Sequence, residues 1–315
     1  MPWGMIKKAI GGFYHVVPEG GDPHAPILCR ARGVFRKDAR TPLAGDRVHF
    51  TLPNAGGEGW IDDIAPRKNA LIRPPVANVD ALIIVQSLVH PPLSRRTLDR
   101  LTVLAEAHGI ALAIVVTKRD LLEDLEEAAR REGEALLAEV ERVYLAVGYP
   151  VVLVNAPRGE GLENVKKLLN GRLTVFAGPS GVGKSTLIRA LVPGAAVEVG
   201  EVSAKTTRGR HTTRAVELLY VEADPGISGR EGGWIADTPG FSALELDLAP
   251  EALPGLFLEF RRYAPACRFR GCLHVAEPGC AVRAAVDGGA IDALRYAHYR
   301  QFLEELKEKA EKRYR

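Results

Sequence analysis

Residues Leu173-Thr-Val-Phe-Ala-Gly178-Pro-Ser-Gly-Val-Gly-Lys184-Ser185-Thr-Leu-Ile-Arg-Ala-Leu191 decide the fold of this chain. A mainly apolar run of strand length leads into a loop with three glycines, and a helical segment follows. The loop matches G-x-x-x-x-G-K-S in the strand–loop–helix context that this pattern needs. Glycines let the backbone wrap around phosphate oxygens, and the helix N-terminus adds positive potential. The stretch therefore predicts a phosphate-binding loop at the end of a sheet strand.

Two side chains of this loop have chemistry of their own. We expect the Lys184 ammonium to reach the β- and γ-phosphates of a nucleotide and to act in catalysis, and the Ser185 hydroxyl to bind Mg²⁺. The predicted nucleotide contacts extend over the whole loop: Gly178, Pro179, Ser180, Gly181, Val182, Gly183, Lys184, Ser185 and Thr186.

From residue 80 onward, strand-length apolar runs alternate with amphipathic helical stretches. We expect strands at 81–89, 110–116, 151–155 and 173–177, and helices at 95–108, within 121–148 and at 162–169. This alternation predicts an α/β domain with a mainly parallel sheet and helices on both faces. In such sheets the ligand binds at the carboxyl ends of the strands.

The segment Thr117-Lys118-Arg-Asp120 ends one of these strands and is similar to the N-K-x-D guanine reader of GTPases. A carboxylate at Asp120 accepts from guanine N1–H and the 2-amino group together, and adenine lacks both donors. The Lys118 stem can lie along the base plane. Thr117 stands in place of the usual asparagine, and its hydroxyl replaces one amide contact but not two. The segment therefore predicts GTP as the nucleotide.

Asn155 and Ala156 follow the next strand, where GTPases place a loop whose backbone N–H contacts guanine O6. The segment Gly233-Trp-Ile-Ala-Asp237-Thr-Pro-Gly240 is an apolar strand that ends in D-x-x-G. We expect Asp237 to hold Mg²⁺ through water and the Gly240 N–H to meet the γ-phosphate. In an ordinary GTPase the phosphate loop precedes the base readers, whereas here the base readers come first. Because a site built from strand ends does not depend on chain order, the order predicts a circularly permuted GTPase domain.

Residues 1–73 have the pattern of a small β domain, with expected strands at 12–17, 27–33, 47–52 and 59–64. Short strands separated by turn formers predict an OB-type β-barrel. The net charge is +4 over residues 1–73, −3 over 74–246 and +2 over 247–315. Basic ends around an acidic middle favour a polyanionic partner such as RNA. A basic barrel that binds nothing is the alternative.

Three of the four cysteines lie in the segment Cys267-Arg-Phe-Arg-Gly-Cys272-Leu-His274-Val-Ala-Glu-Pro-Gly-Cys280. Three thiolates and one imidazole make a closed Cys₃His tetrahedron, which predicts one structural Zn²⁺. We find no signal-peptide pattern, so metal binding is favoured over disulfides. Cys29 is expected to be buried and apolar. The pattern after residue 246 predicts mainly helical structure. The last predicted helix, 290–315, has many charges, which we expect to face mostly solvent.

These motifs together resemble the RsgA family of circularly permuted bacterial GTPases. The likeness also covers Pro42-Leu-Ala-Gly-Asp-Arg-Val48, the linker 66–80, the segment Gly209-Arg-His-Thr-Thr213 and the cysteine cluster. The resemblance implies an OB-fold RNA-binding domain at 1–73, a GTPase domain at 74–246 and a zinc-binding domain at 247–315. It also implies a role in late maturation of the 30S ribosomal subunit, which stimulates GTP hydrolysis, with binding to 16S rRNA.

Hydrolysis needs a group that orients water, and the position after D-x-x-G holds Phe241, which cannot do this. The segment 205–214, between the phosphate loop and D-x-x-G, lies where a mobile switch loop belongs. We expect His211 to orient the water and Thr213, with Thr212 as the alternative, to complete the Mg²⁺ shell. Our hypothesis is that the ribosomal subunit orders this loop. A basic loop that contacts RNA only is the alternative.

Two other functions compete with this interpretation. One is a P-loop kinase or ATPase that acts on a small molecule, and Asp120 speaks against it. The other is a non-catalytic RNA-binding assembly factor with a structural nucleotide, and Phe241 gives it some support. No apolar run reaches the roughly 18 residues of a membrane span. We therefore expect a cytoplasmic protein, acting as a monomer, with GTP or GDP, Mg²⁺ and one Zn²⁺ bound.

Overall fold

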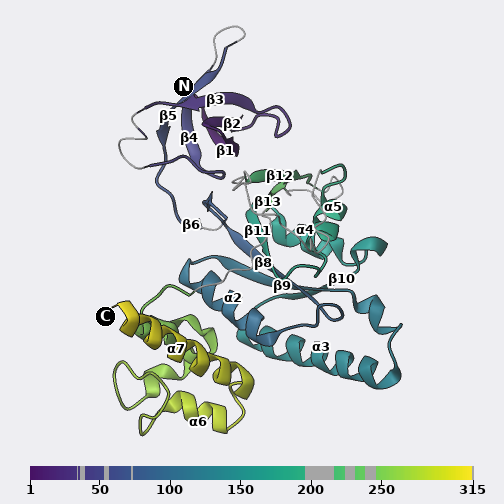
Figure 1. Cartoon of the computed structure of the whole chain (residues 1–315), viewed down its shortest axis with the longest axis vertical. Helices are drawn as coiled ribbons and strands as arrows, with labels where there is room; N and C mark the ends of the chain where they lie inside the picture. Colours follow the sequence, from purple (N-terminus) through teal and green to yellow (C-terminus); the bar gives the residue numbers. More distant parts are fainter. Residues whose placement is uncertain are drawn as a thin grey trace.

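The computed structural model describes residues 1–33, 35, 40–52, 57–71, 74–195, 216–223, 231–237 and 246–313. These residues form three parts that follow one another along the long axis of the molecule: a β-barrel, a central sheet with helices, and a helical C-terminal part (Figure 1). This arrangement confirms the predicted fold class.

The N-terminal barrel closes through five strands in the order β1-β2-β3-β5-β4-β1. All neighbours are antiparallel except β3 and β5, which run parallel. This pairing is that of an OB-type barrel. The inward side chains form one buried cluster around Ile6, Val48 and Phe50, and Cys29 lies in it, fully buried as expected. The strands are β1 (Trp3–Ile10), β2 (Phe13–Pro18), β3 (Ile27–Ala31), β4 (Arg47–Thr51) and β5 (Gly59–Ile64).

The first barrel strand, β1, was absent from the sequence-based expectation. It forms a hairpin with β2 through Gly11 and Gly12, whose φ angles are 60° and 83°. A two-residue turn of this kind requires positive φ at both positions, which two glycines supply without strain. The Gly-Gly pair between two apolar runs was therefore the signal that would have revealed β1.

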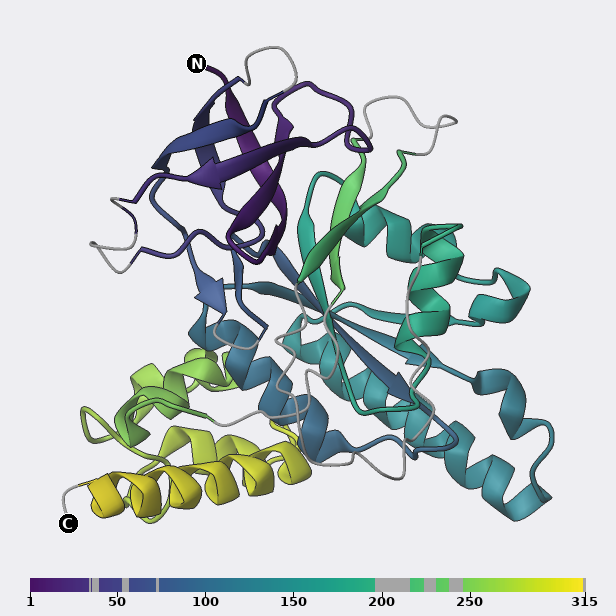
Figure 2. The ribbon, with the colours of Figure 1, turned by 45° about the horizontal axis from the view of Figure 1, so that its top comes forward.

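The central sheet has the order β10-β9-β8-β11-β13-β12. The first five of these strands run parallel, and only β12 is antiparallel to its neighbour. A single bridge between Lys8 and Glu217 continues the sheet from β12 into the barrel strand β1, and the strand pair β12–β13 extends beside the barrel (Figure 2). The strands are β8 (Ala81–Ser87), β9 (Ala111–Thr117), β10 (Val151–Val154), β11 (Leu173–Ala177), β12 (Glu217–Val221) and β13 (Gly233–Asp237).

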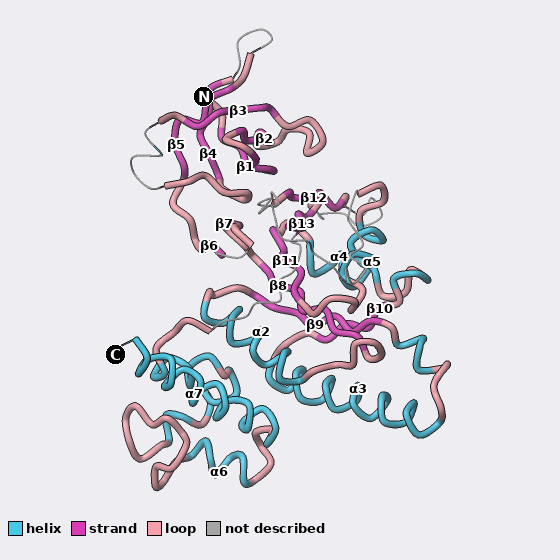
Figure 3. The backbone as a smooth tube through the Cα atoms, in the orientation of Figure 1, coloured by secondary structure: helices cyan, strands magenta, loops and turns pink. Residues whose placement is uncertain are grey.

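Helices cover both faces of this sheet, as predicted (Figure 3). Alternate residues of β8 separate two buried clusters: Leu82 and Ile84 pack under α2 and α3, whereas Ile83 and Val85 pack under α4 and α5. The period of two along the strand thus gives each face its own core. No helix in the described part of the chain is long and apolar enough to cross a membrane. The helices are α2 (Arg95–Ala107), α3 (Glu127–Val147), α4 (Leu162–Leu169) and α5 (Lys184–Leu191).

The junction between barrel and sheet explains two of the sequence segments quoted above. The Asp46 carboxylate is fully buried and accepts two hydrogen bonds from Arg67, each at 2.7 Å. Asn69 exchanges two hydrogen bonds of 2.8 Å with the backbone of Val79. The short hairpin of β6 (Ala70–Leu71) and β7 (Val76–Ala77) lies between them. Because these contacts join residues 42–48 to residues 66–80, the two segments act together as one connector.

The C-terminal part consists of 3₁₀ turns and two helices. They enclose a third buried cluster, which includes Phe257, Phe260, Tyr299 and Phe302, and Val103 of α2 packs into it. The mainly helical expectation is therefore confirmed. The elements are η3 (Pro250–Leu256), η4 (Leu258–Arg262), η5 (Ala264–Ala266), α6 (Ala281–Asp287) and α7 (Ala293–Arg313).

The charges of α7 include an exception to the expected solvent-facing pattern. Arg295 is fully buried and pairs with both Asp99 of α2 and Glu259 of η4. The fully buried Asp99 carboxylate also contacts His298 Nδ1 at 2.6 Å and accepts from the Tyr144 hydroxyl at 2.7 Å. Each of these charges is costly to bury alone, and the network compensates for this cost through mutual pairing. It joins the central sheet to the C-terminal part.

We predict that Asp99→Ala lowers the free energy of unfolding by about 3–5 kcal/mol, because it leaves a buried guanidinium partly unpaired. Urea unfolding followed by circular dichroism measures this loss. The control is Glu127→Ala on α3, which removes an exposed i,i+4 pair with Arg131 and should cost no more than about 0.5 kcal/mol. Equal unfolding midpoints for the two variants would contradict the assignment.

Candidate nucleotide and metal sites

The phosphate loop lies at the carboxyl end of β11, between β8 on one side and β13 on the other. Gly178 opens the loop at φ 148°, and a Cβ atom there would lie 2.1 Å from the Val85 carbonyl oxygen of β8. Only glycine can therefore begin the turn so close to the neighbouring strand. Helix α5 starts at Lys184, so its N-terminus points toward the loop. The arrangement is that of an anion-binding helix terminus.

The Lys184 side chain curls back over the loop. Its ammonium donates to the carbonyl oxygens of Gly178 and Pro179, both at 2.7 Å. Partial burial lowers the pKa of this ammonium. A phosphate oxygen beside this ammonium would stabilise its positive charge, which burial has partly removed from water.

Two residues of the expected base reader are tied to the phosphate loop. The Lys118 ammonium donates to the Gly181 and His90 carbonyl oxygens, both at 2.6 Å. The Thr117 hydroxyl lies 2.6 Å from the Val182 carbonyl oxygen and 3.2 Å from that of Gln86. These hydrogen bonds therefore hold the end of β9 against the loop after β11 and the end of β8, so that three separate segments of the chain lie together.

Asp120 follows in the 3₁₀ turn η1 (Arg119–Leu122). Its side chain is half-buried, and its carboxylate has no hydrogen-bond partner within the described part of the chain. Lys118 precedes it in the left-handed region at φ 60°, which turns the chain sharply after β9. The carboxylate is thus available to a ligand beside the phosphate loop.

Asn155 and Ala156 lie at the end of β10, where η2 (Ala156–Arg158) begins. Asn155 is buried, and its side-chain oxygen accepts from the Arg158 N–H at 3.4 Å, so it caps its own turn. The turn η2 packs against α5, the helix that follows the phosphate loop. All three expected nucleotide-contacting segments therefore meet at the same edge of the sheet.

Strand β13 places the D-x-x-G motif next to the phosphate loop. Its residue Ala236 pairs with Val175 of β11, and Asp237 comes one residue later. The Asp237 side chain, and the expected contacts from Gly240, His211 and Thr213, lie outside the described residues. The strand carrying the expected magnesium ligand thus ends beside the loop that carries Ser185.

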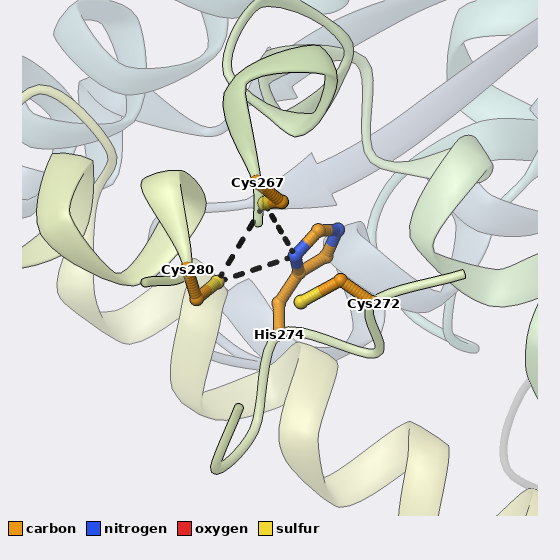
Figure 4. Close-up of side chains that lie close together, drawn as sticks. All are labelled: Cys267, Cys272, His274 and Cys280. Carbon is orange, nitrogen blue, oxygen red and sulfur yellow. Dashed lines mark hydrogen bonds between the residues drawn. The ribbon is translucent and has the colours of Figure 1, made fainter. Parts of the chain in front are cut away.

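The four expected zinc ligands come together in the C-terminal part, and their ligand atoms all lie within 4.8 Å of one another (Figure 4). His274 Nδ1 is 3.6 Å from Cys267 Sγ and 3.4 Å from Cys280 Sγ, and these two sulfurs are 3.9 Å apart. Tetrahedral zinc with ordinary bond lengths separates two sulfurs by about 3.8 Å and sulfur from nitrogen by about 3.6 Å. The cluster therefore could hold one zinc ion, with Nδ1 as the imidazole ligand.

The loop that carries Cys272 and His274 is held by neighbouring groups. The Glu277 carboxylate accepts from the Leu273 and Val275 N–H groups at 2.8 Å and from Ala276 N–H at 3.0 Å. Partial burial alone would raise its pKa, but these hydrogen bonds lower the pKa of Glu277 to about 2. The stability that this cap contributes is therefore fully present at pH values above the ordinary pKa of a glutamate, and it is lost as the pH falls toward 2.

The protonation chemistry of the cluster suits a metal that displaces protons. Burial lowers the pKa of His274, so its imidazole is neutral and can donate a lone pair. Burial raises the pKa of the Cys272 thiol to about 12. Since zinc binds the thiolate, metal loading has to release this proton and weakens in acid.

Two supporting features escaped the sequence analysis. The loop after β8 supplies the His90 carbonyl that holds Lys118, and its position depends on a left-handed His90 at φ 47°. The hydroxyls of Tyr296 and Tyr299 on α7 donate to the carbonyls of His274 and Leu273. No sequence motif predicts these contacts, because each joins residues that are far apart in the chain. The Glu277 cap described above differs, because the acidic residue lies within the segment that carries the cysteines and the histidine.

Comparison with known proteins agrees with this geometry. The signature of the family described as RsgA GTPase matches residues 64–247, and that of the RsgA N-terminal domain matches residues 3–61. The chain is 47% identical over 310 residues to the Small ribosomal subunit biogenesis GTPase RsgA of Geobacillus thermodenitrificans (strain NG80-2), with 98% of this chain and 99% of the relative covered. The corresponding protein of Bacillus subtilis (strain 168) is 42% identical over 310 residues, with the same shares of both chains covered.

Two solved structures share the whole architecture. One is that of YloQ, described as a circularly permuted GTPase, with a TM-score of 0.79 and 38% identity over 98% of this chain and 96% of that one. The other is YjeQ from Thermotoga maritima, with a TM-score of 0.80 and 35% identity over 97% of this chain and 98% of that one. Both the full-length likeness and the strand order, with base-reading strands ahead of the phosphate loop, lead to one conclusion. The chain belongs to the RsgA family of circularly permuted GTPases, and it is an enzyme that hydrolyses GTP.

Proposed function

We propose that the carboxyl edge of the central sheet binds GTP and Mg²⁺ through the residues expected from the sequence. Phosphates would lie in the loop 178–186, with Lys184 on the β- and γ-phosphates, and guanine would lie against Asp120 and the turn at Asn155. The observation that carries this proposal is the pair of ties from Lys118 and Thr117 to the phosphate loop. They support one continuous nucleotide site built from separate strand ends.

We further propose that this GTPase acts in maturation of the small ribosomal subunit, with 16S rRNA as the contacted nucleic acid. The relatives named above carry small ribosomal subunit biogenesis in their names, and the family likeness covers the full chain. The basic barrel and the basic C-terminal part support an RNA partner. A monomeric, cytoplasmic protein with domains at 1–73, 74–246 and 247–315 completes the proposal.

Zinc would have a structural role in this protein. Three sulfurs and His274 Nδ1 fill a tetrahedral shell and leave no open position for water, so the ion would stabilise the C-terminal part without taking part in hydrolysis. The closed donor set and the fixed loop around it support this role.

Hydrolysis would depend on the segment that contains His211 and Thr213. The family is a GTPase family, yet Phe241 stands where other GTPases have a water-orienting glutamine. His211 would orient the attacking water and Thr213 would complete the Mg²⁺ shell, once the small subunit has ordered the segment.

We predict that Asp120→Asn exchanges guanine for xanthine specificity. The amide still accepts from N1–H, but it donates where the carboxylate accepted, so it matches the C2 carbonyl of xanthine and repels the guanine 2-amino group. Calorimetric titration should show GTP binding weakened about 100-fold or more and XTP binding gained. Asp124→Asn, an exposed neighbour four residues away, is the control and should keep GTP selectivity. ATP binding as tight as GTP binding in the unaltered protein would refute the guanine assignment.

We predict that His211→Ala lowers 30S-stimulated GTP turnover about 100-fold and leaves the affinity for GTP within about threefold, because water positioning acts on the chemical step. Phosphate release with and without 30S subunits measures the effect. His108→Ala, an exposed imidazole at the end of α2, should retain stimulated turnover. Unchanged stimulation in His211→Ala would remove this residue from the mechanism.

We predict one zinc ion per chain, reduced to below about 0.2 by Cys280→Ser, because a closed four-ligand shell loses most of its affinity with one thiolate. Elemental analysis of the purified protein measures the content. Cys29→Ala, a cysteine buried in the barrel, provides the control and should keep one zinc. Zinc retained in Cys280→Ser and lost in Cys29→Ala would place the metal elsewhere.

A further inference from the structure

The loop between the first two zinc ligands is unusually open. Residues 268–271 are all exposed, and Phe269 has 46% of its surface accessible. Both ends of the loop are held, because Cys267 and Cys272 belong to the metal cluster and the Arg268 N–H donates to the Gly279 carbonyl at 3.1 Å. A large aromatic side chain is therefore presented to solvent on a short, anchored segment.

The charge around this loop is strongly positive. Residues 261–283 contain five arginines, and Glu277 is their only carboxylate. Glu277 is occupied by backbone N–H groups. Three thiolates and a zinc ion add about one negative charge in total, so the segment stays basic.

Four of these five arginines have no carboxylate partner within the described part of the chain: Arg262, Arg268, Arg270 and Arg283. Arg261 alone is paired, with Glu106. The Arg268 guanidinium lies 5.6 Å from the Phe269 ring centroid, so charge and aromatic surface occur together. Unpaired cations next to an exposed ring are the combination that binds single-stranded nucleic acid.

The barrel offers a contrast. It too has an exposed aromatic side chain, Trp60, at 46% exposure. Three of the four exposed arginines in the described part of the barrel pair with carboxylates, however: Arg30 with Glu58, Arg32 with Asp62 and Arg47 with Glu19, whereas Arg40 has no such partner there. A phosphate backbone would have to compete with these carboxylates at the barrel, but not at the zinc loop.

From these observations we infer that Arg268-Phe269-Arg270 is an rRNA-contacting element, in which Phe269 stacks on an unpaired base and the two arginines bind the flanking phosphates. This inference rests on the proposed function and identifies a contact surface for it. Helix α6, which follows the last zinc ligand, lies at the end of the molecule opposite the barrel (Figure 1). The element would therefore contact rRNA at a point remote from any contact of the barrel.

Binding of fluorescent protein to purified 30S subunits tests the inference. Phe269→Ala should weaken the Kd about 10- to 100-fold, whereas Phe269→Tyr, which keeps the ring, should stay within about threefold. The double variant R268A/R270A should weaken binding and reduce the slope of log K against log salt by about 1–2. Zinc content and thermal midpoint of each variant verify that the loop is still folded.

Matched controls lie elsewhere on the surface. The double variant R130A/R131A removes two exposed arginines that are paired with glutamates on α3. Leu294→Ala removes an exposed apolar side chain of α7 at 43% exposure. Both should bind 30S subunits within about twofold of the unaltered protein.

Chemical footprinting of 16S rRNA on the same complexes separates RNA from protein as the partner. The unaltered protein should protect an unpaired base, and Phe269→Ala should lose this protection alone. Weaker binding with an unchanged footprint would mean that the loop contacts a ribosomal protein, which overturns the inference. Unchanged affinity in Phe269→Ala also overturns it. If the unaltered protein fails to bind 30S subunits, the proposed function itself fails.

Discussion

The proposed nucleotide site depends on one set of contacts, the hydrogen bonds that tie the segment 117–120 to the phosphate loop. Lys118 reaches the Gly181 carbonyl, and Thr117 reaches that of Val182, across a gap of more than sixty residues in sequence. Parallel strands bring their carboxyl ends to one edge, so these contacts form whatever order the strands have in the chain. This is why a GTPase with its motifs in permuted order can keep a single site.

Because of the permuted order, the chain leaves the central sheet through β13 and continues into the C-terminal part. Strand β13, which carries Asp237, lies beside the phosphate-loop strand. The C-terminal part is fastened to α2 by the buried network of Asp99, Arg295 and His298. At the other end, Asp46 and Arg67 fasten the barrel to the linker. Each outer part is thus held by an ion pair whose carboxylate, Asp99 or Asp46, is fully buried and costly to leave unpaired.

The barrel and the C-terminal part differ in how many of their exposed arginines are paired with carboxylates. Both are basic by composition, but in the described residues three of the four exposed barrel arginines are paired with carboxylates, whereas four of the five arginines at 261–283 are not. Net charge alone therefore says little about where a polyanion binds. Cations without a carboxylate partner are a better guide to such a surface, because they can neutralise phosphate without giving up an existing ion pair.

Sequence alone determined the motifs and the class of fold, because the phosphate loop, the base readers and the cysteine cluster are local patterns with local chemistry. The apolar run at 81–87 and the alternation of strand and helix likewise need only neighbouring residues. The tertiary structure decided what depends on distant residues: that Thr117 bonds to the phosphate loop, that His274 faces the sulfurs through Nδ1, and that Arg295 is buried. A helix with charges on every side does not reveal which one will meet Asp99, nearly two hundred residues earlier, because that pairing exists only once the helices have packed.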